Sequence, residues 1–131
     1  MIDGQQRVTI IDIGIAQRKD ASGSAVASGD GTHEFMPPEQ RAKSTVDDRA
    51  DVFCLAGTLY RLVVQHNPVA ETNQPSVVGT HLDEVQDHRL RAILKTGMAP
   101  SAGDRYASAA QLAAALREWD TQGGLAALEL R

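Results

Sequence analysis

The chain has 131 residues, of which 42% are hydrophobic and 23% are charged, and its formal net charge is −4; this composition is that of one small soluble globular domain. The negative charge and the lack of a basic run argue against nucleic acid and anionic membranes as partners. No apolar run is long enough to span a bilayer, the first residues show no secretory signal, and the single cysteine excludes an internal disulfide framework, so we expect a cytoplasmic protein with no membrane contact.

The N-terminal part combines a predicted strand, a loop and a short helix. Residues 7–11 (RVTII) predict a short buried strand, and Asp12 follows directly at its end. Residues 18–31 are small and polar without periodicity, which predicts a loop. The proline pair at 37–38 can begin a helix but cannot continue one, so we expect a short helix from there to about Lys43.

The rest of the chain predicts three longer helices. Residues 49–65 are the strongest helical segment, and their apolar side chains cover more than one face, which is typical of a buried central helix. Residues 66–87 predict a loop, and residues 88–97 predict a helix that its last glycine could end. Residues 108–111 (SAAQ) match a capping box, which predicts that the last helix begins at this serine and runs to about Trp119.

Four segments carry recognisable motifs in order along the chain: Asp12-Ile13-Gly14, residues 31–40 (GTHEFMPPEQ), residues 50–63 and residues 103–116. They resemble, respectively, the D-F-G triplet, the G-T-x-x-Y-M-A-P-E-Q stretch, the hydrophobic F helix, and the last helix with its lead-in of a protein kinase catalytic domain. The most similar kind is the eukaryotic-like serine/threonine kinase of prokaryotes, and the resemblance to its C-terminal part covers residues 2–119. A lone D-I-G triplet carries little information, but GTHEFMPPEQ is specific, and four motifs in the family's order argue against coincidence.

The resemblance implies a mainly α fold, cut from an α+β parent. The chain would be a fragment of the kinase C-lobe with a short N-terminal β segment and an activation segment. Residues 1–120 would form a partial kinase domain, from just after the catalytic loop to the last helix, and residues 121–131 would form a C-terminal tail.

The resemblance also assigns roles in the N-terminal part. Asp12 stands where the family binds magnesium on the phosphates of ATP, and we expect this position to be vestigial here. Residues 15–36 match the activation segment, and Thr32 matches a threonine that contacts the catalytic loop in the family. Three serines of this segment are candidate phosphorylation sites by position, although each one alone is more often a solvated loop residue: Ser22, Ser24 and Ser28.

In the helical part, the resemblance implies structural roles. It pairs Glu39 with Arg105 in a mostly buried ion pair that ties the activation segment to the last helices; two independent surface charges would be the alternative. Asp51 matches an aspartate that accepts hydrogen bonds from the catalytic loop, and without that loop it is a helix-start acid. Cys54 is expected to be a small buried hydrophobe, and Trp119 a packing residue. The four histidines show no metal-ligand spacing.

The parts that perform phosphoryl transfer in the family have no match in these 131 residues. They are a glycine-rich loop, a lysine with its glutamate, a catalytic aspartate and a second magnesium ligand; the first two residues align just after that ligand. We therefore expect no catalytic residue in this chain, and no magnesium or ATP bound by the chain alone. The favoured interpretation is a truncated serine/threonine kinase domain that is inactive alone and whose parent phosphorylates protein. The alternatives are one half of a split kinase, completed by a partner that carries the missing N-lobe, and a non-catalytic scaffold that binds protein.

Overall fold

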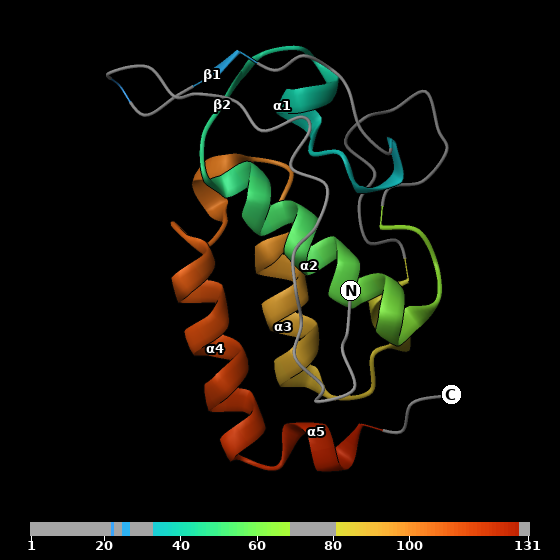
Figure 1. Cartoon of the computed structure of the whole chain (residues 1–131). Coiled ribbons are helices and arrows are strands. Elements are labelled where there is room, and N and C mark those ends of the chain that lie inside the picture. The colour runs from blue at the N-terminus through green and yellow to red at the C-terminus, as the bar shows by residue number, and fades with distance from the viewer. Residues whose placement is uncertain (1–21, 23–24, 27–32, 69–80, 129–131) are drawn as a thin grey trace, which may run out of the picture.

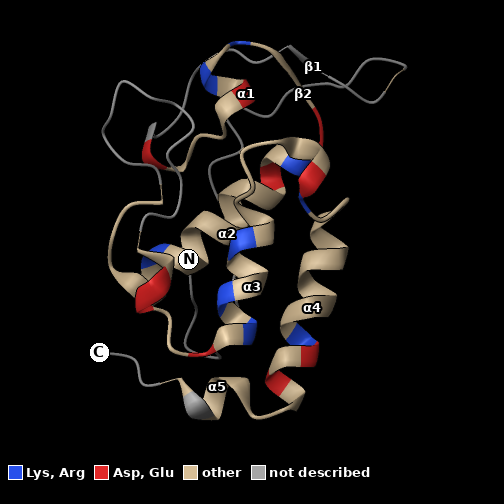
Figure 2. Cartoon of the chain, turned by 180° about the vertical axis from the view of Figure 1, so that it is seen from behind, with Lys and Arg blue, Asp and Glu red and all other residues tan. Residues whose placement is uncertain are grey.

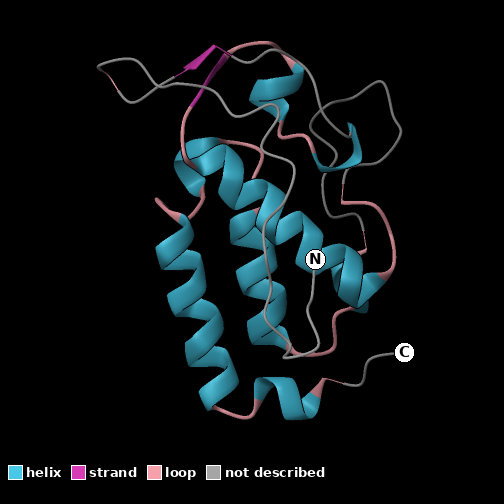
Figure 3. Cartoon of the chain, in the orientation of Figure 1, coloured by secondary structure: helices cyan, strands magenta, loops and turns pink. Residues whose placement is uncertain are grey.

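The computed structural model describes residues 22, 25–26, 33–68 and 81–128, and over these residues the chain is mostly helical (Figures 1 and 3). This confirms the predicted mainly α class. The helices are α1 (Pro38–Arg41), α2 (Arg49–Val64), α3 (His88–Gly97), α4 (Ala109–Thr121) and α5 (Gly124–Ala127), with 3-10 turns η1 (His33–Phe35), η2 (Leu82–Glu84) and η3 (Ala102–Asp104), and strands β1 (Ala25–Val26) and β2 (Thr45–Val46).

Three helices build the core. In Figure 1, α3 and α4 lie side by side and α2 crosses them, and each of the three packs on the other two. Along α2, Val52, Phe53 and Tyr60 are fully buried at a spacing that keeps them towards the other helices. The largest buried side chains of α3 are leucines, which fill the space between α2 and α4: Leu90 and Leu94.

The surroundings of α2 leave part of its apolar surface exposed. Its predicted span is confirmed to within one residue, and Gln65 ends it in the left-handed conformation with φ of 63°. However, Leu55 is 44% exposed and Leu62 is 65% exposed, so α2 is not buried all round. The face that carries these two leucines is the one that neither α3 nor α4 covers within the described part of the chain.

The short elements were not all expected. Residues 18–31 were predicted to be loop, but β1 pairs antiparallel with β2, with Ala25 opposite Val46. Two paired residues leave no side-chain periodicity, so the sequence could not show them. The strand predicted at 7–11 lies outside the described residues. No described helix has the length and apolar character needed to cross a membrane.

The last helix begins as predicted but ends differently. The Ser108 hydroxyl accepts a hydrogen bond from the backbone N–H of Gln111 (3.3 Å), whereas the Gln111 side chain accepts from the N–H of Ala107 (2.9 Å) rather than from that of Ser108. The chain turns at Gly123, where φ is 85°, and continues into α5 instead of a tail. A Cβ at Gly124 would lie 2.3 Å from Cε2 of Trp119, so only glycine lets α5 start this close to α4.

Candidate functional site

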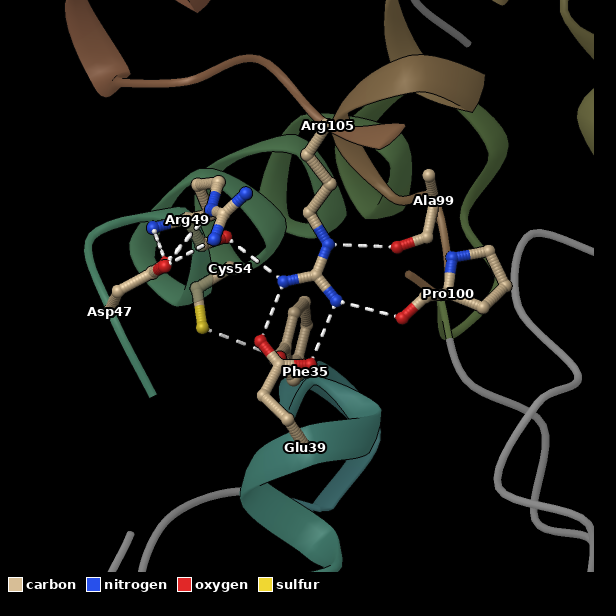
Figure 4. Close-up of polar contacts among 8 residues, drawn as sticks. All are labelled: Phe35, Glu39, Asp47, Arg49, Cys54, Ala99, Pro100 and Arg105. Atoms are coloured by element: carbon tan, nitrogen blue, oxygen red, sulfur yellow. Dashed lines mark hydrogen bonds and ion pairs between the residues drawn. The ribbon is translucent and has the colours of Figure 1, made fainter. Parts of the chain in front are cut away.

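The most extensive polar cluster of the described residues surrounds Arg105, which follows η3 and precedes α4. Its side chain is fully buried. Figure 4 shows the guanidinium donating to Glu39 and to three backbone carbonyls. The Nη1 atom donates to Oε1 of Glu39 (2.6 Å) and to the carbonyl of Arg49 (3.1 Å), Nη2 donates to Oε2 of Glu39 (2.8 Å) and to the carbonyl of Pro100 (3.1 Å), and Nε donates to the carbonyl of Ala99 (2.7 Å).

These contacts use the whole donor capacity of the side chain. A guanidinium carries five N–H groups in a fixed fork, and each has an acceptor here. The carboxylate is bound by two parallel bonds, the geometry in which arginine is most selective for carboxylate. The guanidinium also lies 4.9 Å from the centre of the Phe53 ring, which adds a cation–π contact from α2.

The cluster joins segments far apart in the sequence. Glu39 lies in the first turn of α1, which the proline pair initiates, and Arg49 begins α2. Ala99 and Pro100 follow α3, so a single side chain holds α1, the start of α2 and the exit of α3 together. A buried pair of this kind is weak evidence for net stability, but removal of one partner leaves an uncompensated buried charge.

A second contact fixes η1 to α2. The Cys54 thiol donates to the carbonyl of Phe35 at 3.4 Å. Burial raises the pKa of the Cys54 thiol to about 11, and the charge of Asp51 adds to this effect. The thiol therefore stays protonated at neutral pH, which suits a structural donor and not a nucleophile.

The start of α2 carries a further arginine–carboxylate pair. Asp47 accepts from the Nε atom of Arg49 through both oxygens (3.1 and 3.0 Å) and from the backbone N–H of the same residue (2.9 Å). The hydrogen bonds from the Arg49 guanidinium hold the pKa of the Asp47 carboxyl below its usual range. Asp51, which the sequence predicted to be a helix-start acid, lies in the first turn of α2 and is exposed.

The structure describes only some of the predicted site residues. It brings Glu39 and Arg105 together, and it places Ser22 in an exposed turn. The other candidates of the N-terminal part lie outside the described residues: Asp12, Ser24, Ser28 and Thr32.

Sequence reasoning missed a contact between α3 and α4. Trp119, predicted only as a packing residue, is buried and donates its indole N–H to Oδ2 of Asp87 at 2.9 Å. Asp87 also caps α3, accepting from the N–H groups of Arg89 (2.8 Å) and Leu90 (3.2 Å). The N-cap position of Asp87 was a signal in the sequence, but its indole partner was not.

Two histidines whose sequence spacing shows no metal-ligand pattern come together in the fold. His66 and His81 lie beside Glu84, and one candidate ligand atom from each of the three residues lies within 4.8 Å of the other two. A spacing rule tests only residues close in sequence, and these histidines come from different turns of the fold.

Comparison with known proteins gives consistent results. A family model described as "Protein kinase domain" matches residues 1–129. A probable serine/threonine-protein kinase of Corynebacterium efficiens is 32% identical over 133 residues, which cover 88% of this chain and 20% of that protein. The serine/threonine-protein kinase PknB of Mycolicibacterium smegmatis is 30% identical over 129 residues, which cover 88% and 21%.

The matches among solved structures include a mycobacterial kinase domain. The kinase domain of Mycobacterium tuberculosis PknI is 32% identical, with a TM-score of 0.49 over 64% of this chain and 34% of that one. The chain spans about a fifth of the length of the curated relatives it matches.

Proposed function

This chain belongs to the protein kinase family, and from that premise we propose that residues 1–120 supply the activation segment and C-terminal helices of a serine/threonine protein kinase. Its substrates would be proteins, and magnesium and ATP would serve as cofactors of the complete domain. Asp12 is the residue that would hold magnesium, a role that rests on the motif alone. The proposal includes a cytoplasmic location, on the ground of the single cysteine.

The contact that carries this proposal is the bidentate pair between Arg105 and Glu39. It joins two motifs that lie 66 residues apart, and the resemblance to kinases calls for this pairing. Neither partner alone is diagnostic, because single buried arginines occur in many folds. The pairing of both within their motifs is what favours a kinase over an unrelated helical domain.

The surroundings of this pair suit an anchored activation segment. The segment 15–36 runs directly into α1, where Glu39 is held by Arg105. Its last residues are fixed to α2 by the Cys54 thiol at the carbonyl of Phe35. A segment that positions a protein substrate needs one firm end, because small misplacements of the reacting groups cost large factors in rate.

We further propose that residues 1–131 on their own do not transfer phosphate. Phosphoryl transfer depends on positioning and electrostatic stabilisation by several groups that act together. Within this sequence Asp12 supplies one carboxylate. Magnesium in such sites is held jointly by carboxylates and by substrate phosphates, which nothing in this sequence would fix. The residues that accept the proton of the substrate hydroxyl would come from elsewhere.

The test is an assay of phosphate transfer from labelled ATP to a generic protein substrate in the presence of magnesium. Purified 1–131 is compared with its Asp12→Ala variant, each with and without a second polypeptide that carries a kinase N-lobe and catalytic loop. Transfer that requires the second polypeptide and falls with Asp12→Ala supports the proposal. Transfer by 1–131 alone that disappears in Asp12→Ala would show that the active site has been misassigned.

A scaffold and a split kinase remain the other candidates. A scaffold would give no transfer in any combination yet would bind a protein partner, and Asp12→Ala would leave that binding unchanged. A split kinase requires that the second polypeptide be a separate natural chain, which co-purification from the source organism would reveal.

A further inference from the structure

Two histidines and a glutamate form a compact cluster: His66, His81 and Glu84. They lie just after α2 and in or beside η2, and Figures 1 and 2 show the chain before α3 passing next to the end of α2. The Nδ1 atom of His81 lies 2.9 Å from Oε1 of Glu84, and Nε2 of His66 lies 3.9 Å from the same oxygen. The two imidazole rings are stacked, with centroids 4.0 Å apart and planes at 14°. All three side chains are about half exposed, so an ion from solvent can reach them.

The backbone positions of the cluster are fixed by buried groups. The N–H of His81 donates to the hydroxyl of the fully buried Tyr60 (3.1 Å), which ties η2 to α2. The N–H of Glu84 donates to the carbonyl of His81 (3.1 Å), so these two side chains leave the same side of one 3-10 turn.

His66 is held from both sides along the chain. It follows α2 by two residues, after the left-handed turn at Gln65. Pro68 is fully buried, and its ring lies close to Gly57 of α2, because a Cβ added there would come within 3.2 Å of it. The three candidate ligands therefore project from restrained backbone, while their side chains keep the freedom to reorient.

From this geometry we propose that His66, His81 and Glu84 bind a divalent transition-metal ion, of which zinc is the best match. Zinc accepts imidazole nitrogen at about 2.0–2.1 Å and carboxylate oxygen at about 2.0–2.2 Å, so two ligand atoms on one tetrahedral ion lie roughly 3.4 Å apart. The spacings of 2.9 and 3.9 Å bracket that value. Three protein ligands leave the fourth position to water.

Binding requires one defined rearrangement. Imidazole lone pairs lie in the ring plane, so two stacked, nearly parallel rings cannot both point at one ion. At least one ring must turn about its side-chain torsions, which costs little for a half-exposed histidine. Zinc binding therefore opens the stack, and this opening is a signature that a merely electrostatic association would not produce.

The ligand types also favour transition metals over magnesium, the ion that kinases use. Magnesium prefers an all-oxygen octahedral shell and retains its waters, whereas two imidazoles suit zinc, copper and nickel. The ion would clamp the end of α2 to η2, and it would stabilise the folded chain by an amount that grows with the logarithm of its free concentration once that concentration exceeds Kd. The inference does not depend on the proposed kinase function, because it uses none of the kinase motif residues.

The experiment titrates metal-free 1–131 with zinc chloride by calorimetry, with two-dimensional NMR of the histidine ring nitrogens as a second measurement. We expect one zinc per chain, with ring signals of two histidines shifted, and no displacement by excess magnesium. His66→Gln and His81→Gln should each weaken zinc binding at least about tenfold, since even second-shell changes cost 10–100-fold. Glu84→Gln should weaken it as well.

His88→Gln is the matched control, because His88 is an exposed histidine on α3 outside the cluster. Its zinc affinity should equal that of the wild type. The proposal is overturned if saturable zinc binding is absent, or if His66→Gln and His81→Gln bind as tightly as His88→Gln. An unchanged affinity in Glu84→Gln would overturn the three-ligand site. Circular dichroism of each variant verifies that a loss of binding is not a loss of fold.

Discussion

Two arginine–carboxylate pairs meet at the start of α2, and they differ in almost everything except chemistry. The side chains of Arg105 and Glu39 are 0% and 16% exposed, and the residues lie 66 positions apart. The side chains of Arg49 and Asp47 are 35% and 31% exposed, and these residues lie two positions apart. Burial makes the loss of one partner costly, and long sequence separation makes the pair a tertiary contact. The first pair therefore holds the fold, and the second shapes a local turn.

The two pairs are nevertheless connected, as Figure 4 shows. The carbonyl of Arg49 is one of the acceptors of Arg105, while the N–H of Arg49 donates to Asp47. The local pair thus shapes the backbone on which the buried guanidinium docks. We therefore expect substitutions in the buried pair to lower the free energy of unfolding most and substitutions in the exposed pair to lower it least. Contacts of intermediate burial should have intermediate effects.

The largest expected effect is that of Arg105→Ala. It would leave the Glu39 carboxylate and three backbone carbonyls without their donor, and the loss of one partner of a buried pair costs about 3–5 kcal/mol. Urea denaturation followed by circular dichroism measures the change in the free energy of unfolding. Arg117→Ala, at an exposed position of α4, is the control, and it should stay within about 0.5 kcal/mol of the wild type. Equal midpoints for the two variants would contradict the tertiary role of Arg105.

The contact between Trp119 and Asp87 should have an intermediate effect. It also links residues far apart in sequence, but Asp87 is 17% exposed and keeps its capping bonds when the indole is lost. Trp119→Phe retains most of the packing and removes the N–H donor, and a hydrogen bond to a charged group contributes about 1.5–3 kcal/mol. We expect the loss in the free energy of unfolding, measured by the same denaturation experiment, to lie near the lower end of this range. A loss as large as that of Arg105→Ala would mean that packing of the indole, and not its hydrogen bond, dominates.

The same contact predicts a dependence on pH. The hydrogen bond from Trp119, with help from the N–H groups of Leu90 and Arg89, holds the pKa of the Asp87 carboxyl well below its usual range. The folded state thus binds this proton less readily than the unfolded state, where the pKa is about 3.9. The contribution of Asp87 to stability is therefore present above that pH and is lost as the pH falls further.

Comparison of unfolding at pH 7 and at acidic pH tests this assignment. The gap in stability between the wild type and Trp119→Phe should narrow as the pH falls below about 4, because the unfolded chain then takes up a proton at Asp87 that the folded wild type, with its lower pKa, does not bind. This change of the gap with pH should be smaller than the loss of stability that Trp119→Phe causes at pH 7. A gap that stays constant with pH would show that the indole does not act on the charged form of Asp87.

Much of the helical framework could be predicted from the sequence. The bounds of α3, 88–97, were predicted to the residue, because this helical segment ends at a glycine that could stop it. By contrast, α5 was missed. A glycine pair at 123–124 normally ends a helix, whereas here the second glycine begins one against the Trp119 ring.

Likewise, only some of the polar contacts could be predicted from the sequence. The pairing of Glu39 with Arg105 was expected from motifs, which identify side chains. The carbonyl acceptors of the same arginine could not be expected, because every residue carries a carbonyl and only the fold selects among them. The meeting of His66 with His81 likewise depends on how the chain folds back after α2.

The smallest expected effect is that of Arg49→Ala. The side-chain pair with Asp47 is partly exposed and therefore screened by water and salt, so the midpoint should match that of the wild type at both low and high ionic strength. Asp47→Ala is the informative partner, because it removes the bond to the backbone N–H of Arg49 as well. It should destabilise more than Arg49→Ala, since a side-chain oxygen on a free N–H at a helix start contributes more than an exposed ion pair. If the two variants were equally destabilised, the exposed ion pair itself would contribute to stability. The contrast drawn between the buried pair of Arg105 and the local pair of Arg49 would then be wrong for the local pair.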